Sequence, residues 1–337
     1  MQPSLKRSEL DGLAEFYSLD TQRTETLLEL ADARPSRAEG LRFLATCLRI
    51  GGILSLAAGV VFFVAANWSK LAVFGRFALI ELVLVACAAL AFVRPPPAFV
   101  GRGAAFLAFI ATGALLALFG QTYQTGADVY ELFLTWSLLG LPLVAAAMWS
   151  VASAAWVLVL NTALLLFCGW HPAGGLLWAL FGGMPFRPAH LVLCAAALNL
   201  ALWFAFEMLR VDAVPDWVRR LILSCAFGFG AWGGVLGVIG GDIAFDESRA
   251  DPTALVALAV AMTLVAGYAV RRRTDVYPLA VIMGTFILVS TVWLARTIEF
   301  KDEGMFLLMA LWLIGTSTAA GRVLTVVTRR WRADGAR

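Results

Sequence analysis

Long apolar runs alternate with short polar segments along most of this chain, beginning near residue 45. A helix needs about 20 mostly apolar residues to cross a bilayer, and each run reaches that length. Lipid leaves no partner for unpaired backbone groups, so a spanning segment is a helix or part of a closed barrel. The runs lack the alternation of apolar and polar residues that barrel strands would show, so they favour helices. The pattern therefore predicts an all-α polytopic bundle of about ten spans. These lie near residues 45–66, 71–93, 99–120, 130–149, 151–170, 189–209, 217–240, 252–270, 276–296 and 304–326.

A polar segment precedes the first span. Ser36 and Glu39 have the spacing of a capping box, in which hydroxyl and carboxylate satisfy free backbone donors. The helix that begins there is expected to run unbroken into the first span, about 30 residues or roughly 45 Å. The predicted parts are a cytoplasmic helical prefix (1–44, too small for an enzyme domain), the bundle (45–327) and a basic cytoplasmic tail (328–337).

Composition agrees with a membrane protein and charge sets its orientation. Hydrophobic residues make up 61% of the chain and charged residues 15%, against about 25% charged in soluble proteins. If the N-terminus is cytoplasmic, 20 of the 26 Lys and Arg fall on that side and five on the other. Positive residues favour the cytoplasmic side, which places both termini there. The net charge of +3 needs no nucleic-acid partner.

The residue types that carry common chemistry are sparse. The five cysteines all lie inside predicted spans without metal spacing, and the two histidines, His171 and His190, are nineteen residues apart. We therefore predict no disulfide framework, metal site or cofactor. The chain also shows no nucleophile–base pair or phosphate-binding loop, so an enzyme is the least favoured class.

The most distinctive string, residues 120–131, joins the third and fourth spans and reads GQTYQTGADVYE. It holds two amides, two carboxylates and two phenols, and no basic residue. Part has a structural explanation, because Gly126 can take a positive φ and Asp128 with Glu131 can cap the fourth helix. Capping does not explain three residues, for which a ligand or ion role is the alternative: Gln121, Tyr123 and Gln124.

Together, Asn67-Trp68, Arg76 and the GQTYQTGAD string resemble a bacterial family of predicted membrane proteins of unknown function. The resemblance covers roughly residues 5–150. It implies a short cytoplasmic helical prefix followed by multiple spans, and hence a multi-pass protein of the inner membrane. It implies no reaction.

Several of these residues are expected near the outer face. Arg76 lies about one and a half turns into the second span. A half-buried Arg in a span is stabilised by an acidic or amide partner. Asp128, Glu131 and the Gln121–Gln124 stretch are the candidates, and Asn67 falls at the same depth. Two alternatives follow. One is an Arg–carboxylate contact that only holds helices together, and the other is a ligand site.

Three polar residues are expected near the bilayer centre: Glu81, Asn161 and Asn199. Ionisable groups at that depth are costly and suggest function, so the three could form one cluster on a transport path. The alternative is that a neutral Glu81 only hydrogen-bonds another helix. We interpret Glu207, near the inner interface beside Arg210, as solvated.

Small residues recur every four positions in the first span (Gly51, Ser55, Gly59) and in the seventh, around Gly230–Gly241. Such spacing lets helix backbones approach, either within one chain or across a homodimer. Residues 171–188 are apolar but interrupted by glycine and proline, and are expected to be interfacial or re-entrant.

The function favoured by these observations is binding and movement of a small solute or ion across the inner membrane. The alternative is a non-transporting scaffold or sensor that docks a membrane partner protein through its prefix or outer loops. A membrane enzyme acting on lipid comes third.

The charge distribution generates a testable topology. Reporter fusions at Arg271–Arg273 and after the last residue should both report the cytoplasm, because positive residues are retained on that side. An external C-terminus would exclude the ten-span arrangement.

Overall fold

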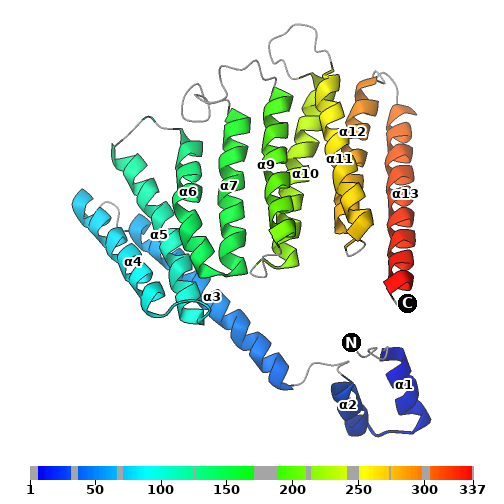
Figure 1. Ribbon diagram of the computed structural model, residues 1–337, viewed down its shortest axis with the longest axis horizontal. Helices are drawn as coiled ribbons and strands as arrows, with labels where there is room; N and C mark the ends of the chain where they lie inside the picture. Colours follow the sequence, from blue (N-terminus) through cyan, green and yellow to red (C-terminus); the bar gives the residue numbers. More distant parts are fainter. Residues whose placement is uncertain are drawn as a thin grey trace. The chain divides into compact units, whose positions relative to one another are not determined.

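The computed structural model describes ten stretches of the chain: residues 7–31, 37–66, 71–123, 126, 128–170, 188–209, 214–240, 250–272, 275–297 and 304–335. All regular structure within them is helical, and ten of these helices are long and apolar enough to cross a membrane (Figure 1). The predicted fold class, a multi-span helical bundle, is confirmed. The predicted interfacial or re-entrant segment lies, except for Pro188, outside the described residues.

The helix bounds follow the predicted spans closely. Two short helices come first, α1 (Arg7–Phe16) and α2 (Thr21–Leu30). The long helices are α3 (Arg37–Ala66), α4 (Val73–Val93), α5 (Phe99–Tyr123), α6 (Val129–Ala147), α7 (Ser150–Trp170), α9 (Pro188–Leu209), α10 (Asp216–Ile239), α11 (Pro252–Arg272), α12 (Tyr277–Thr297) and α13 (Gly304–Gly335). The last helix thus continues through most of the predicted tail.

The chain forms two compact units, Met1–Ala72 and Val73–Arg337. In the first unit α1 and α2 pack as a helical hairpin. Leu10 and Leu28 are buried in it, at 1% and 7% exposed. The helix that the capping box predicts is confirmed, since α3 runs for 30 residues without a break.

In the second unit, helices that follow one another pack together, from α4 on α5 to α6 on α7. Helix α10 lies at the centre of the second half, where it contacts α7, α9, α11 and α12 (Figure 1). Two clusters of buried apolar residues surround its contacts with α7 and α9, one around Ile222 and the other around Phe229.

Glycines explain the central place of α10. A methyl group on Gly233 would stand 2.8 Å from Leu193 of α9, and one on Gly234 would stand 2.6 Å from Leu258 of α11. Both distances are shorter than van der Waals contact. The small-residue pattern of this span therefore serves packing within the chain, which was one of the two alternatives.

Helices α5 and α6 interlock through two glycines and two aromatic rings. The Trp136 indole lies against Gly113, and the Phe109 ring lies against Gly140. The two rings stack at 5.2 Å, and Trp136 Nε1 donates a hydrogen bond to the Phe109 carbonyl oxygen at 2.8 Å. The ring and the hydrogen bond fix both the distance and the register of the two helices.

This interlock predicts that Gly113→Ala destabilises the protein. The added methyl would overlap a rigid indole, and overpacking of this kind costs about 1–3 kcal/mol. Thermal denaturation of the purified protein in detergent measures the effect. The matched control is Gly120→Ala in the same helix, where a methyl meets nothing within 4 Å. Equal melting temperatures for both variants would contradict the interlock.

Candidate functional site

A hollow of about 830 Å³ opens between the end of α5 and the beginning of α6. Three residues of the predicted GQTYQTGAD region line it: Gln121, Asp128 and Glu131. Gly120 and Gly126 line it as well, with apolar side chains such as Leu132 below them. One amide and two carboxylates of the distinctive string thus share one concave surface, which we name the outer hollow.

The carboxylate of Asp128 is not used for capping. Asp128 stands at the N-cap of α6 with φ −69° and ψ 148°, yet its side chain makes no cap hydrogen bond. Only its backbone carbonyl takes part, accepting from the Glu131 amide at 2.9 Å. The expected positive φ of Gly126 is confirmed at 68°. The capping explanation is therefore wrong for the Asp128 side chain, which instead lines the outer hollow.

Glu131 is held in place by its neighbour. The buried Tyr130 donates a hydrogen bond from its hydroxyl to Glu131 Oε1 at 3.3 Å, and its ring packs on Phe167 of α7 at 5.2 Å. Glu131 is half-buried. The hydrogen bond from Tyr130 orients its Oε1 atom.

Tyr123 takes no part in the outer hollow. Its ring packs on Phe119 at 4.8 Å and on Phe77 of α4 at 6.0 Å, so it joins two helices. Arg76 precedes Phe77 and is half-buried, and its expected contact with Asp128, Glu131 or the Gln121–Gln124 stretch stays a prediction. Gln124 and Asn67 lie outside the described residues.

The structure brings Asn161 and Asn199 together at the middle of α7 and α9. Asn161 Nδ2 donates to Asn199 Oδ1 at 3.1 Å, and Asn199 Nδ2 donates to Asn161 Oδ1 at 2.9 Å. The second hydrogen of each amide goes to a backbone carbonyl of its own helix, Val157 or Ala195. Both residues are buried and all four N–H groups are satisfied, so the pair is closed.

Glu81 does not join this pair. It lies on α4, which packs on α5, and its side chain is exposed. Whereas the sequence suggested one polar cluster at mid-depth, the structure shows a closed amide pair and, separately, a carboxylate on the surface of α4. Depth along a helix does not specify the face on which a residue stands.

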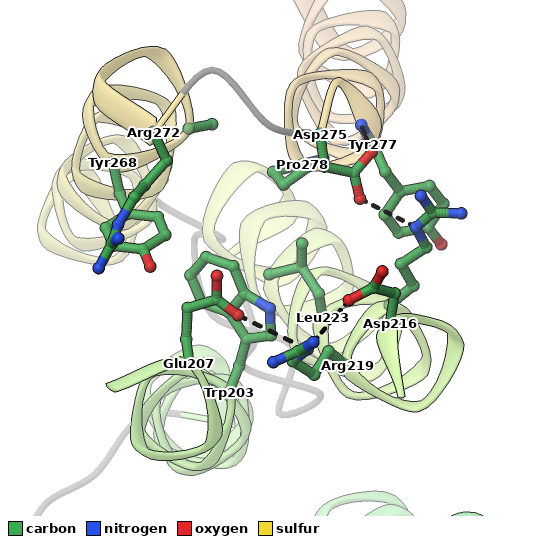
Figure 2. Close-up of a pocket in the computed structure, with 12 residues that line it drawn as sticks. Trp203, Glu207, Asp216, Arg219, Leu223, Tyr268, Arg272, Asp275, Tyr277 and Pro278 are labelled. Carbon is green, nitrogen blue, oxygen red and sulfur yellow. Dashed lines mark hydrogen bonds and ion pairs between the residues drawn. The ribbon is translucent and has the colours of Figure 1, made fainter. Parts of the chain in front are cut away.

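Glu207, which the sequence suggested to be solvated beside Arg210, is half-buried, and Arg210 lies outside the described residues. Its carboxylate lies 3.7 Å from Arg219 Nε, and its side chain is 25% exposed (Figure 2). Arg219 also pairs with Asp216 at 2.6 Å, one helical turn earlier. The i, i+3 spacing of Asp216 and Arg219 was visible in the sequence, but the contact with α9 was not.

The sequence also gave no reason to connect His190 with the start of α11. His190 Nε2 lies 2.9 Å from Thr253 Oγ1, and His190 Nδ1 lies 3.4 Å from Asp251 Oδ2. Thr253 in turn donates its hydroxyl hydrogen to Asp251 Oδ1 at 2.6 Å. The three side chains connect α9 to α11 at the predicted outer side. His190 lies about sixty residues before Asp251 and Thr253, so no local sequence pattern could have indicated the contact.

The pKa of Asp251 is lowered from its ordinary value. Burial acts to raise this pKa, but hydrogen bonds from Thr253 and the Ala254 amide, together with His190, outweigh it. A carboxylate with a depressed pKa stabilises the fold above its ordinary pKa, and that stability is lost as the pH falls through the lowered value. The N-terminal end of α11 is thus held by a charged cap at neutral pH.

Residues 15–153 match a protein family described as "Predicted membrane protein (DUF2157)". The match covers less than half of the chain; it includes the outer hollow and the helical prefix from the end of α1 onward. No curated protein and no solved structure matches the chain. The match and the ten apolar helices make this chain an integral membrane protein.

The closed amide pair predicts strong coupling between its members. Asn161→Leu leaves the buried Asn199 amide without its partner, which costs about 1–2 kcal/mol in a membrane protein. The double variant with Asn199→Leu should be no less stable than either single variant, because no orphaned amide remains. Thermal unfolding of all four proteins measures this cycle. Additive losses would show that the two amides do not depend on each other.

Proposed function

We propose that this protein binds a small solute or ion in the outer hollow and moves it across the bacterial inner membrane. The observation that carries the proposal is that Gln121, Asp128 and Glu131 line one concave surface with no basic lining residue in the described part of the chain. Ligand sites are typically concave and largely apolar, with a few polar groups that set specificity.

The charge of the lining favours a cation or a solute that carries a positive group. Two carboxylates focus a negative potential in a concave surface with apolar walls. Carboxylate and amide oxygens are also the ligands that hard cations prefer. Because the Asp128 side chain makes no cap hydrogen bond, it is available to such a ligand.

Movement across the membrane would need a path beyond the outer hollow. Asn161 and Asn199 lie at mid-depth on the fifth and sixth of the ten candidate spanning helices. Secondary transporters commonly bind substrate near the bilayer midplane. In this proposal the amide pair opens when α7 and α9 separate, and its four donors and two acceptors then line the path. Glu81 is a candidate for the same path from α4.

The alternative is a scaffold that docks a partner protein through its prefix. Phe16 and Leu30 are 81% and 83% exposed on the α1–α2 hairpin, which supports an apolar contact surface there. A scaffold requires neither the carboxylates of the outer hollow nor flux, so the two functions are separable by experiment.

Cation binding is tested first. The melting temperature of the purified protein should rise with one of Na⁺, K⁺, Mg²⁺ or Ca²⁺ at constant ionic strength, since a ligand at about 100 times its Kd adds about 2.7 kcal/mol. Asp128→Asn combined with Glu131→Gln should abolish the rise. Asp20→Asn, an exposed carboxylate of the prefix, is the matched control and should keep it. A rise that survives the double variant would exclude the outer hollow.

Flux of the same cation into proteoliposomes then separates transport from binding alone. The double variant Asp128→Asn with Glu131→Gln should lose flux, and Glu81→Gln should lower flux if Glu81 lies on the path. Binding without flux in the wild type would favour the scaffold or sensor.

A further inference from the structure

A second pocket lies at the opposite end of the bundle, on the predicted cytoplasmic side. It is formed by the end of α9, the beginning of α10, the end of α11 and the beginning of α12 (Figure 2). Its volume is about 140 Å³, close to that of an engineered cavity of about 150 Å³ that takes up benzene. The pocket therefore suits a headgroup-sized molecule. We name it the inner pocket.

Most of the charges that line the inner pocket pair with each other. Arg220 Nε lies 2.9 Å from Asp275 Oδ2, and the other oxygen of Asp275 accepts from the Tyr277 amide at the start of α12. Arg219 pairs with Asp216 at 2.6 Å. These two pairs hold α10 against α12 and fix the beginning of α10.

Three other groups of the inner pocket keep donors or acceptors available to a ligand: the exposed Arg272, the half-buried Glu207 and the Tyr268 hydroxyl. Arg272 makes no ion pair with a carboxylate in the described residues; its guanidinium lies over the Tyr268 ring at 5.6 Å. Glu207 shares Arg219 with the nearer Asp216 and reaches it only at 3.7 Å. The Tyr268 hydroxyl is buried between Glu207 and Arg272 and within reach of both, but it makes no well-formed hydrogen bond with either (Figure 2).

These groups stand in a defined order. Figure 2 shows the cation on the α11 side, the carboxylate on the α9 side and the phenol between them, with the Trp203 ring beside the carboxylate. Trp203 and Tyr268 meet edge to face at 5.4 Å. A positive and a negative group with an unsatisfied donor between them complement a ligand that carries both signs. A simple anion would meet Glu207, and a simple cation would meet Arg272.

We propose that the inner pocket binds phosphoethanolamine, either as the headgroup of a membrane lipid or as the free zwitterion. The phosphate lies toward Arg272 and accepts the Tyr268 hydroxyl hydrogen, and the ammonium donates to Glu207. Guanidinium is well suited to phosphate because its donors form a planar fork. A buried polar group without a partner is rare in native proteins. This ligand gives the Tyr268 hydroxyl an acceptor and pairs with the exposed Arg272 and the half-buried Glu207. The proposal does not rest on the function proposed for the outer hollow.

The full-length protein, purified in detergent and freed of lipid, tests the chemistry. O-phosphoethanolamine should raise the melting temperature, and O-phosphocholine should do so at least about tenfold less effectively, because a trimethylated nitrogen cannot donate a hydrogen bond to Glu207. Nanodiscs that contain phosphatidylethanolamine, phosphatidylcholine or phosphatidylglycerol, followed by mass spectrometry of retained lipid, identify the source. Retention of phosphatidylethanolamine supports the lipid, and binding of only the soluble compound supports the free zwitterion.

Variants separate binding from stability. Arg272→Gln and Glu207→Gln should each weaken phosphoethanolamine binding about tenfold or more. Arg271→Gln is the matched control, since Arg271 is exposed in the same turn of α11 and does not line the inner pocket. Tyr268→Phe removes a hydroxyl that makes no well-formed hydrogen bond in the protein. This variant should therefore melt no lower than the wild type and still bind phosphoethanolamine more weakly.

Three results would overturn the proposal. One is that neither the soluble compound nor the lipid binds the wild type. Another is that phosphocholine binds as well as phosphoethanolamine. The third is that Arg272→Gln, Glu207→Gln and Tyr268→Phe all bind as the wild type does, which would leave the inner pocket as an ion-paired clamp between helices.

Discussion

Hydrocarbon offers no hydrogen-bond partner to the backbone, and this constraint governs every spanning segment of the protein. Each apolar run must satisfy its own N–H and C=O groups, so it becomes a helix whatever its neighbours do. The same constraint applies to side chains. Trp136 donates to a carbonyl of α5, and Asn161 and Asn199 satisfy each other between α7 and α9. These polar side chains within the bundle thus satisfy their hydrogen bonds on a neighbouring helix and join the two helices.

Because lipid is as apolar as a leucine side chain, close packing must supply much of what holds such helices together. Gly113 and Gly140 admit aromatic rings between α5 and α6, and Gly233 with Gly234 lets α9 and α11 approach α10. The small residues and the polar pairs therefore complement each other. The glycines set how near two helices come, and the hydrogen bonds set their register.

The two pockets with several polar groups lie at ends of the helices, where water and lipid headgroups reach them. The outer hollow is lined by Asp128, whose side chain makes no N-cap hydrogen bond to α6. The inner pocket holds the Tyr268 hydroxyl and an under-paired Glu207. Both candidate sites of the described residues therefore lie at ends of the spanning helices.

The sequence by itself determined the helical class, the ten spans and the unbroken α3, because these depend on local hydrophobicity and on backbone groups satisfied within one helix. It also identified Gln121, Asp128 and Glu131, which are close in the chain. Only the tertiary structure decided that Asn161 meets Asn199 without Glu81, and that Glu207 faces Arg219 and Tyr268. In an apolar helix nearly every face is hydrophobic, so sequence gives a residue's depth but not its direction, and direction decides which side chains meet.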